Sequence, residues 1–154
     1  GAAGHGYGSL DLFYFYKDAD GPFPKNGFQH WRKAAAYEGT SQMGLMRRLF
    51  EQRPWHKMVP DQSVLASEPG GGPYRLVAAR AENGSFVMAY TARGQSVGIH
   101  MDKLRGSPVK AQWYDPRDGT WKVIGQYSNK GIQEFVAPSR GEQDDWVLVL
   151  DATP

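Results

Sequence analysis

Cysteine is absent from this chain of 154 residues. Its absence excludes disulfide bonds, thiolate zinc sites and cysteine nucleophiles. Long apolar runs are lacking too, since none approaches the ~20 residues that a membrane-spanning helix needs. Charge of one sign is not in excess, because 18 basic and 16 acidic residues are interspersed along the chain. We therefore expect neither a membrane nor a nucleic acid as the partner.

Sequence motifs for common chemistries are missing as well. No Gly-x-Ser-x-Gly motif, phosphate-binding loop or dinucleotide fingerprint occurs in the chain. The acidic stretch that contains Asp11, Asp18 and Asp20 lacks the glycine and the terminal glutamate of an EF-hand loop. The histidines are not spaced like metal ligands. We predict no metal site and no cofactor.

The chain does contain many turn formers and aromatic residues. It has 19 glycines, 10 prolines, five tryptophans and eight tyrosines. Glycine and proline at this frequency imply many turns, as an all-β domain requires. The aromatic content exceeds what a core usually needs, and it fits a β-rich protein that packs or stacks on ligands such as sugars.

Residues 1–62 are predicted to form loops and helices. Residues 28–37 favour a short helix that Gly39 ends, and Thr40 or Ser41 offers an N-cap for a stronger helix over 40–52. The apolar residues of that second helix recur at helical spacing and predict one buried face. They are Leu45 and Leu49 beside Met43, Met46 and Phe50. We expect Val59 to Gln62 to fix the turn into the next domain and part of this helix to dock on it.

From residue 63 the pattern changes to short strands with turn signals every eight to twelve residues. Asn83-Gly84 between two apolar runs is a strong hairpin signal. The predicted strands are 74–81, 86–91, 96–101, 109–114, 121–127, 132–136 and 146–151. Because no helix intervenes, the sequence predicts an antiparallel β-sandwich of seven to eight strands, preceded by a loop and one or two helices. Neighbouring residues on a strand point to opposite faces, so we expect one of Trp113 and Tyr114 to lie in the core and the other outside.

Several short motifs together resemble a known family. The chain is similar to the C-terminal part of apiosidase-like glycoside hydrolases, in which a (β/α)8 barrel precedes a β-sandwich that is labelled as collagen-binding. The motifs that carry the resemblance are Gly1-Ala2-Ala3-Gly4-His5-Gly6-Tyr7-Gly8, Arg53-Pro54-Trp55, Val59-Pro60-Asp61-Gln62-Ser63, Trp113-Tyr114-Asp115-Pro116-Arg117 and Asp145-Trp146-Val147-Leu148-Val149-Leu150-Asp151. One segment departs from the family pattern, since Ser9 to Phe15 stands where a polar residue and Trp-Gln are expected.

The resemblance implies two parts with different roles. Residues 1–62 would be the last strand, loop and helix of an incomplete barrel, and residues 63–154 would be the sandwich. The chain would then be a fragment or a processed product, because the acid and the nucleophile of such a barrel come from earlier strands. A retaining glycosidase needs two carboxyl groups roughly 5 Å apart, one protonated and one ionised. We therefore expect no catalytic residue in this chain.

The resemblance also suggests candidate binding residues. His5 and Tyr7 would lie where a barrel strand ends, which is where barrels build their active sites. Both side chains could hydrogen-bond sugar hydroxyls. Trp113, Tyr114 and Trp121 could supply a surface for stacking on a glycan or on collagen, and packing in the core is the competing explanation for them.

Two functions follow from this reading. The first is a non-catalytic sandwich that supports a bacterial glycoside hydrolase. The second is an independent extracellular module that binds collagen or polysaccharide. A third, a stand-alone enzyme, is disfavoured because no carboxylate pair is evident. The expected partners are the rest of the barrel or another protomer, with carbohydrate or collagen as ligands. The resemblance implies a secreted or periplasmic protein.

Overall fold

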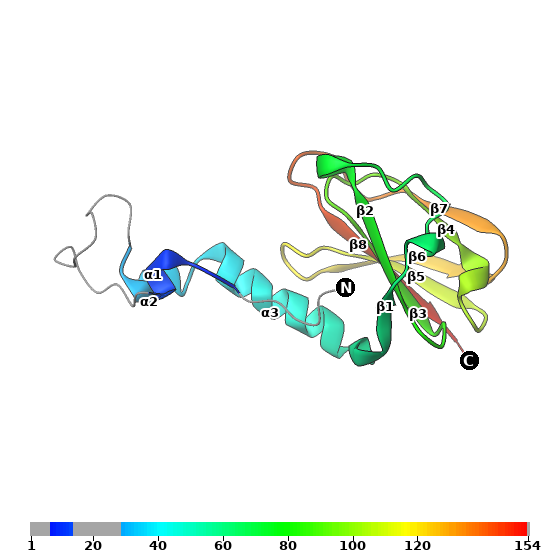
Figure 1. The fold of residues 1–154 in the computed structure, drawn as a ribbon, viewed down its shortest axis with the longest axis horizontal. Coiled ribbons are helices and arrows are strands. Elements are labelled where there is room, and N and C mark those ends of the chain that lie inside the picture. The colour runs from blue at the N-terminus through cyan, green and yellow to red at the C-terminus, as the bar shows by residue number, and fades with distance from the viewer. Residues whose placement is uncertain (1–6, 14–28, 154) are drawn as a thin grey trace. The chain divides into compact units, whose positions relative to one another are not determined.

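The structure is a computed structural model that describes residues 7–13 and 29–153 (Figure 1). The chain divides into two compact units, Gly1–Arg48 and Leu49–Pro154. The first unit contains α1 (Leu10–Phe13) and α2 (Trp31–Ala34). Helix α3 (Glu38–Glu51) belongs to both units, because its last turn lies in the second one.

Asp11 connects the short helices of the first unit. The backbone N–H of Gln29 donates to one carboxylate oxygen of Asp11 at 3.0 Å, and the Tyr37 hydroxyl donates to the other at 2.9 Å. Asp11 is buried, and both of its carboxylate oxygens accept hydrogen bonds inside the unit. Asp11 therefore has a structural role, while Asp18 and Asp20 lie outside the described residues.

Helix α3 begins earlier than the sequence predicted. It starts at Glu38, so Gly39 lies inside the helix, and the prediction that Gly39 ends the preceding helix is wrong. A Cβ atom at position 39 would come within 3.1 Å of the Tyr7 ring. Glycine is therefore explained here by the close approach of an aromatic side chain, and such packing offsets the low helix propensity of glycine.

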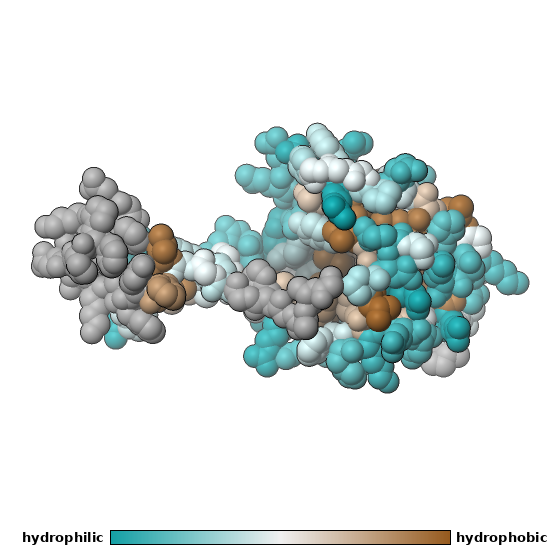
Figure 2. Space-filling view, in the orientation of Figure 1, coloured by the Kyte–Doolittle hydropathy of each residue, from teal (hydrophilic) through white to brown (hydrophobic). Residues whose placement is uncertain are grey.

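The second unit is an antiparallel β-sandwich, as the sequence predicted (Figure 1). Its larger sheet has the strand order β1-β2-β3-β8-β5-β6, and its smaller sheet pairs β4 with β7. The strands are β1 (Met58–Pro60), β2 (Leu76–Ala81), β3 (Phe86–Thr91), β4 (Val97–His100), β5 (Val109–Tyr114), β6 (Trp121–Tyr127), β7 (Ile132–Phe135) and β8 (Trp146–Ala152). Polar side chains cover much of the unit's visible surface, with apolar surface between them (Figure 2).

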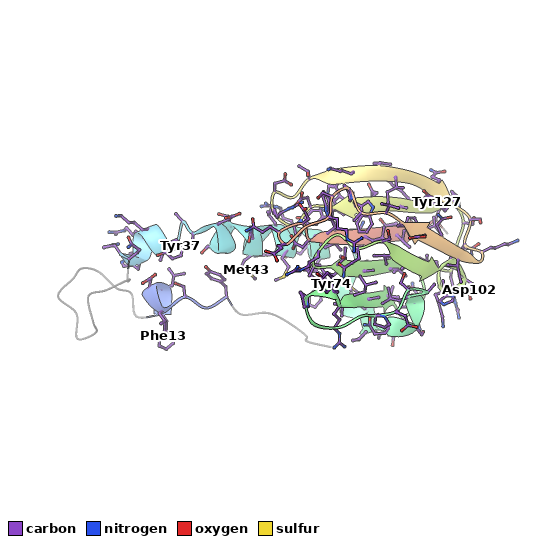
Figure 3. All side chains as sticks on the ribbon, turned by 90° about the horizontal axis from the view of Figure 1, so that it is seen from above. Phe13, Tyr37, Met43, Tyr74, Asp102 and Tyr127 are labelled. Carbon is purple, nitrogen blue, oxygen red and sulfur yellow. The ribbon has the colours of Figure 1, made fainter. Side chains whose placement is uncertain are left out.

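The main core fills the space between the two sheets. Leu148 and Leu150 from β8 face Ile99 and Phe135 from the smaller sheet, and all four are buried. Tyr127 closes the edge of this core with its ring centre 5.2 Å from that of Phe135 (Figure 3). These residues lie on what we call the inner face of the larger sheet.

A second apolar cluster covers the opposite face of the larger sheet, which we call the outer face. Leu49 from the last turn of α3 is only 3% exposed and packs in this cluster with Phe50 beside it. The sheet contributes Ala81, Phe86, Met88, Tyr114, Val147 and Val149. The prediction that part of the helix docks on the sandwich is confirmed for this last turn.

The segment after the helix joins the sheet directly. Met58–Pro60 pairs with β2 as strand β1, which the sequence analysis missed because three residues are too short to show a period. The Gln62 side chain then donates to the Leu76 carbonyl at 3.0 Å and accepts from the Ala78 N–H at 2.6 Å. Gln62 thus continues the hydrogen bonding to β2 after β1 has ended. The expected turn over Val59 to Gln62 begins later than predicted, because Val59 and Pro60 already pair with β2 and only Asp61 and Gln62 leave the strand.

Candidate functional site

The first predicted site falls only partly within the described structure. His5 lies outside the described residues. Tyr7 is 40% exposed and its ring lies beside Gly39 of α3. Sugar binding by His5 and Tyr7 stays a prediction.

The aromatic residues proposed for stacking are placed differently from a binding surface. Trp113 and Tyr114 point to opposite faces of the sheet, as strand geometry predicted, but each is only 2% exposed. Trp113 lies in the main core, where its indole N–H donates to the Val136 carbonyl at 3.0 Å. Tyr114 lies in the outer cluster, where apolar side chains from α3 and the sheet cover that face. Neither ring presents a face to a ligand.

Trp121 is the third of these aromatic residues, and it is partly buried at the junction of helix and sheet. Its ring centre lies 4.8 Å from that of Tyr114. The guanidinium carbon of Arg53 lies 5.4 Å from the Trp121 ring centre, within the range of a cation–π contact. Trp121 is therefore engaged in holding the end of the helix.

The junction is completed by an ion pair between Arg53 and Asp151. Arg53 Nε donates to one carboxylate oxygen of Asp151 at 2.7 Å, and Arg53 Nη2 donates to the other at 2.6 Å. The Arg53 side chain is 10% exposed and that of Asp151 32%. Arginine suits this position because its planar fork matches a carboxylate with two parallel bonds. No local pattern in the sequence indicates this pairing, because the two residues lie far apart along the chain.

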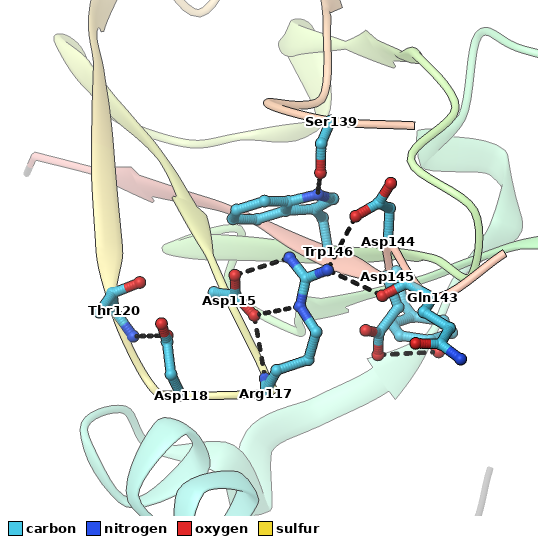
Figure 4. A network of polar contacts seen from close by, with 10 residues as sticks. Asp115, Arg117, Asp118, Thr120, Ser139, Gln143, Asp144, Asp145 and Trp146 are labelled. Carbon is cyan, nitrogen blue, oxygen red and sulfur yellow. Dashed lines mark hydrogen bonds and ion pairs between the residues drawn. The ribbon is translucent and has the colours of Figure 1, made fainter. Parts of the chain in front are cut away.

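A second polar network holds the β5–β6 turn to the loop before β8 (Figure 4). Arg117 donates to both carboxylate oxygens of Asp115, each at 2.7 Å. The same guanidinium also donates to Asp144 at 2.9 Å and to the Gln143 carbonyl at 2.7 Å. These bonds raise the pKa of Arg117, with Asp115 as the largest cause. Arg117 thus links the β5–β6 turn to the loop before β8 by hydrogen bonds.

Trp146 packs against the cationic side chains of this network. Its indole N–H donates to the Ser139 hydroxyl at 3.1 Å. The Arg117 guanidinium lies 5.0 Å and the Lys122 ammonium 4.7 Å from the Trp146 ring centre. Asp115 and Asp118 stabilise the β5–β6 turn, since Asp115 accepts from the Arg117 N–H at 3.0 Å and Asp118 accepts from the Thr120 N–H at 2.8 Å.

Two carboxylates of this region have pKa values that move in opposite directions. Burial raises the pKa of Asp145, whose carboxylate accepts from the Tyr90 hydroxyl at 3.3 Å. Burial also acts to raise the pKa of Asp115, but the hydrogen bonds from Arg117 outweigh burial and lower it. Opposite shifts are typical of an acid and base pair. Here both oxygens of Asp115 are occupied by Arg117, so Asp115 is not free to act as a base or a nucleophile.

The part of the chain that the structure describes contains no group of side chains that could bind a metal ion. Over residues 7–13 and 29–153, no three histidine, aspartate or glutamate side chains gather as a metal site. None of the described helices is long and apolar enough to cross a membrane.

Family models match both parts of the chain. Residues 59–151 match the family described as "Putative collagen-binding domain of a collagenase". The chain belongs to that family. Residues 1–57 of this collagen-binding-like chain match the family described as the apiosidase-like catalytic domain. The two matches meet between residues 57 and 59, where the structure passes from the helix end into strand β1.

Solved structures of glycoside hydrolases resemble the collagen-binding-like chain over nearly its whole length. One is titled a glycoside hydrolase, with a TM-score of 0.88, 28% identity and 97% of this chain covered. Another is a glycoside hydrolase family 5 protein from Bacteroides vulgatus, with a TM-score of 0.87, 28% identity and 97% coverage. The chain spans 33% and 32% of their lengths, about a third of each. No protein of curated function matches the sequence.

Proposed function

We propose that this chain is the non-catalytic accessory part of a glycoside hydrolase and that its sandwich holds the last helix of the catalytic barrel. One observation carries the proposal. Residues 49–57 match the apiosidase-like catalytic domain, yet they belong to the compact unit of the sandwich. The end of one domain is thus built into the other.

The contacts inside the second unit hold residues 49–57 to the larger sheet. Leu49 is buried on the outer face of the sheet, and Arg53 is held by two charge-assisted hydrogen bonds to Asp151. A flexible linker would instead be rich in glycine and serine and would be exposed. Through these contacts the sandwich would hold the last turn of the barrel's last helix, and this is the support that it would give.

An independent module that binds collagen or polysaccharide is the alternative, and the family's description favours it. The buried positions of Trp113 and Tyr114 weigh against a stacking surface at these residues. The most exposed aromatic side chains among the described residues of the second unit are Trp55 and Tyr74. A secreted or periplasmic, bacterial protein that acts on carbohydrate would suit either function.

Two measurements on the purified chain separate these functions. The first is hydrolysis of a panel of aryl glycosides, with a complete glycoside hydrolase as the positive control. The second is binding to immobilised collagen and to insoluble polysaccharides, with Trp55→Ala and Tyr74→Ala as surface variants. The support function predicts neither hydrolysis nor binding. Hydrolysis would overturn the non-catalytic assignment, and binding lost in Trp55→Ala or Tyr74→Ala would establish the binding module instead.

A further inference from the structure

The outer face of the larger sheet is apolar over more than the area that α3 covers. Strands β2, β3 and β8 each place apolar residues on both of their faces. On the outer face they present Val77, Ala79 and Ala81, then Phe86, Met88 and Tyr90, then Val147 and Val149. Strands that read as continuous apolar runs are typical of sheets covered on both sides. A strand with one face toward solvent would instead alternate apolar and polar residues along its sequence.

One row of side chains crosses this face from strand to strand. Val77 pairs with Tyr90, Tyr90 with Val147, Val147 with Tyr114, and Tyr114 with Trp121. We call these five residues the outer row. Val147 and Tyr114 are buried, whereas Tyr90 is 36% and Val77 46% exposed. The row is therefore covered in its middle and open at the β2 end.

The open end is continuous with an interface that the chain already makes. Val147 and Tyr114 share one buried cluster with Leu49, which comes from the segment matched to the catalytic domain. Single exposed apolar residues are common on protein surfaces. Val77 and Tyr90 differ from such residues because they directly extend a helix-covered cluster across neighbouring strands. A hydrogen bond from the Tyr90 hydroxyl to Asp145 provides a polar rim at this end.

We infer that the rest of the catalytic domain packs on the open end of the outer row, at Val77 and Tyr90. This inference rests on the proposed function, because it identifies the surface through which the sandwich supports the barrel. The occupant is the polypeptide that completes the apiosidase-like domain, since this chain spans about a third of its structural relatives. Its covering surface should be apolar opposite Val77 and should provide a polar group near the Tyr90 hydroxyl.

The absence of cysteine allows a direct test by thiol labelling. Val77→Cys and Tyr90→Cys probe the open end of the outer row. Val136→Cys is the matched control, because Val136 is 73% exposed and follows β7 of the smaller sheet. Each variant is made in the 154-residue chain and in the longer protein that the proposed function implies, which we call the longer gene product. Labelling by a maleimide is followed by peptide mass mapping. Circular dichroism of each variant confirms that the sandwich is folded.

We expect the thiols introduced by Val77→Cys and Tyr90→Cys to react at least about tenfold more slowly in the longer gene product than in the shorter chain. The thiol of Val136→Cys should react equally fast in both. Equal rates in the two proteins for all three variants would overturn the inference. In the shorter chain, the Val77→Cys thiol could become better protected as the protein concentration rises. That result would also overturn the inference, because a second copy would then cover this surface. Neither outcome depends on hydrolysis by the isolated chain, so a failure here is distinct from a failure of the proposed function.

Discussion

Arg53 and Asp151 lie 98 residues apart in the sequence, yet their side chains meet in a bidentate ion pair with the shorter bond at 2.6 Å. The pair joins the segment that follows α3 to the last strand of the sandwich. Because β8 lies between β3 and β5 in the larger sheet, the segment after the helix is held to one of the two central strands.

Removing the charge of Asp151 and removing that of Arg53 should have unequal effects on the free energy of unfolding. Asp151→Asn leaves the buried Arg53 charge without a full counter-charge, and one nitrogen, Nη1, already has no hydrogen-bond partner among the described residues. We expect Asp151→Asn to lower the free energy of unfolding by about 2–3 kcal/mol and Arg53→Met by only about 1 kcal/mol. Methionine keeps the contact with Trp121, and the freed Asp151 can hydrate. Urea unfolding of both variants measures the difference, and equal losses would contradict this account of the pair.

The Arg117 network should make stability depend on acid. The pKa of Asp115 is lowered in the folded chain, so the unfolded chain binds more protons and the free energy of unfolding falls as the pH falls through the ordinary range near ~3.9. Asp115→Asn should cost about 1.5–3 kcal/mol at pH 7. Between neutral and acid pH, the free energy of unfolding of Asp115→Asn should fall less steeply than that of the wild type.

Asp61 provides an independent comparison for this acid dependence. Hydrogen bonds from Ser63 and Arg80 lower the pKa of Asp61, so Asp61→Asn should also flatten the acid slope. Denaturant titrations at several pH values measure both variants. If Asp115→Asn kept the full slope of the wild type, the network would not be the source of the acid dependence.

Two glycines with the same backbone conformation test the packing of the loop before β8. Gly94 has φ +64° and Gly131 has φ +71°. An added Cβ at Gly94 would collide with the Ser139 carbonyl oxygen, whereas nothing lies within 4 Å of one at Gly131. Gly131→Ala should cost about 1–2 kcal/mol for the left-handed conformation alone. Gly94→Ala should cost more than about 3 kcal/mol because the backbone must also move. Thermal unfolding compares them, and similar losses would show that the Ser139 loop moves aside.

Much of the sandwich could be predicted from the sequence because its strands are short and separated by strong turn signals. Strands β3, β5 and β6 have the predicted bounds, and Asn83-Gly84 does form a turn between β2 and β3. Strand alternation also predicted that Trp113 and Tyr114 would point to opposite faces. What alternation could not show is that the outer face is covered, since that depends on where Leu49 of the helix packs.

The missed features share one cause, which is contact between distant segments. Local pattern predicts that Gly39 ends a helix. The structure explains this glycine differently, by the close approach of the Tyr7 ring, and Tyr7 lies 32 residues away in the sequence. The pairing of Arg53 with Asp151 and of Arg117 with Asp144 likewise depends on the fold. Local pattern predicts elements well, but it does not predict which charged side chains meet.

The central claim is that the sandwich supports the catalytic domain through the last turn of α3. The most direct test compares Leu49→Ala with Arg48→Ala, the adjacent and exposed position, in the longer protein that we propose contains this chain. Leu49→Ala should cost the sandwich about 2–4 kcal/mol, because it leaves a cavity in the outer cluster, and Arg48→Ala less than about 0.5 kcal/mol.

The decisive measurement uses the glycoside hydrolase that we propose contains this chain. It is the temperature at which each variant of that protein loses hydrolytic activity, with activity at low temperature as the reference. The account predicts that Leu49→Ala lowers this temperature by several degrees while Arg48→Ala and the wild type coincide, and that low-temperature activity is the same in all three. Unfolding of the sandwich in Leu49→Ala at a temperature where hydrolysis continues undiminished would contradict the claim.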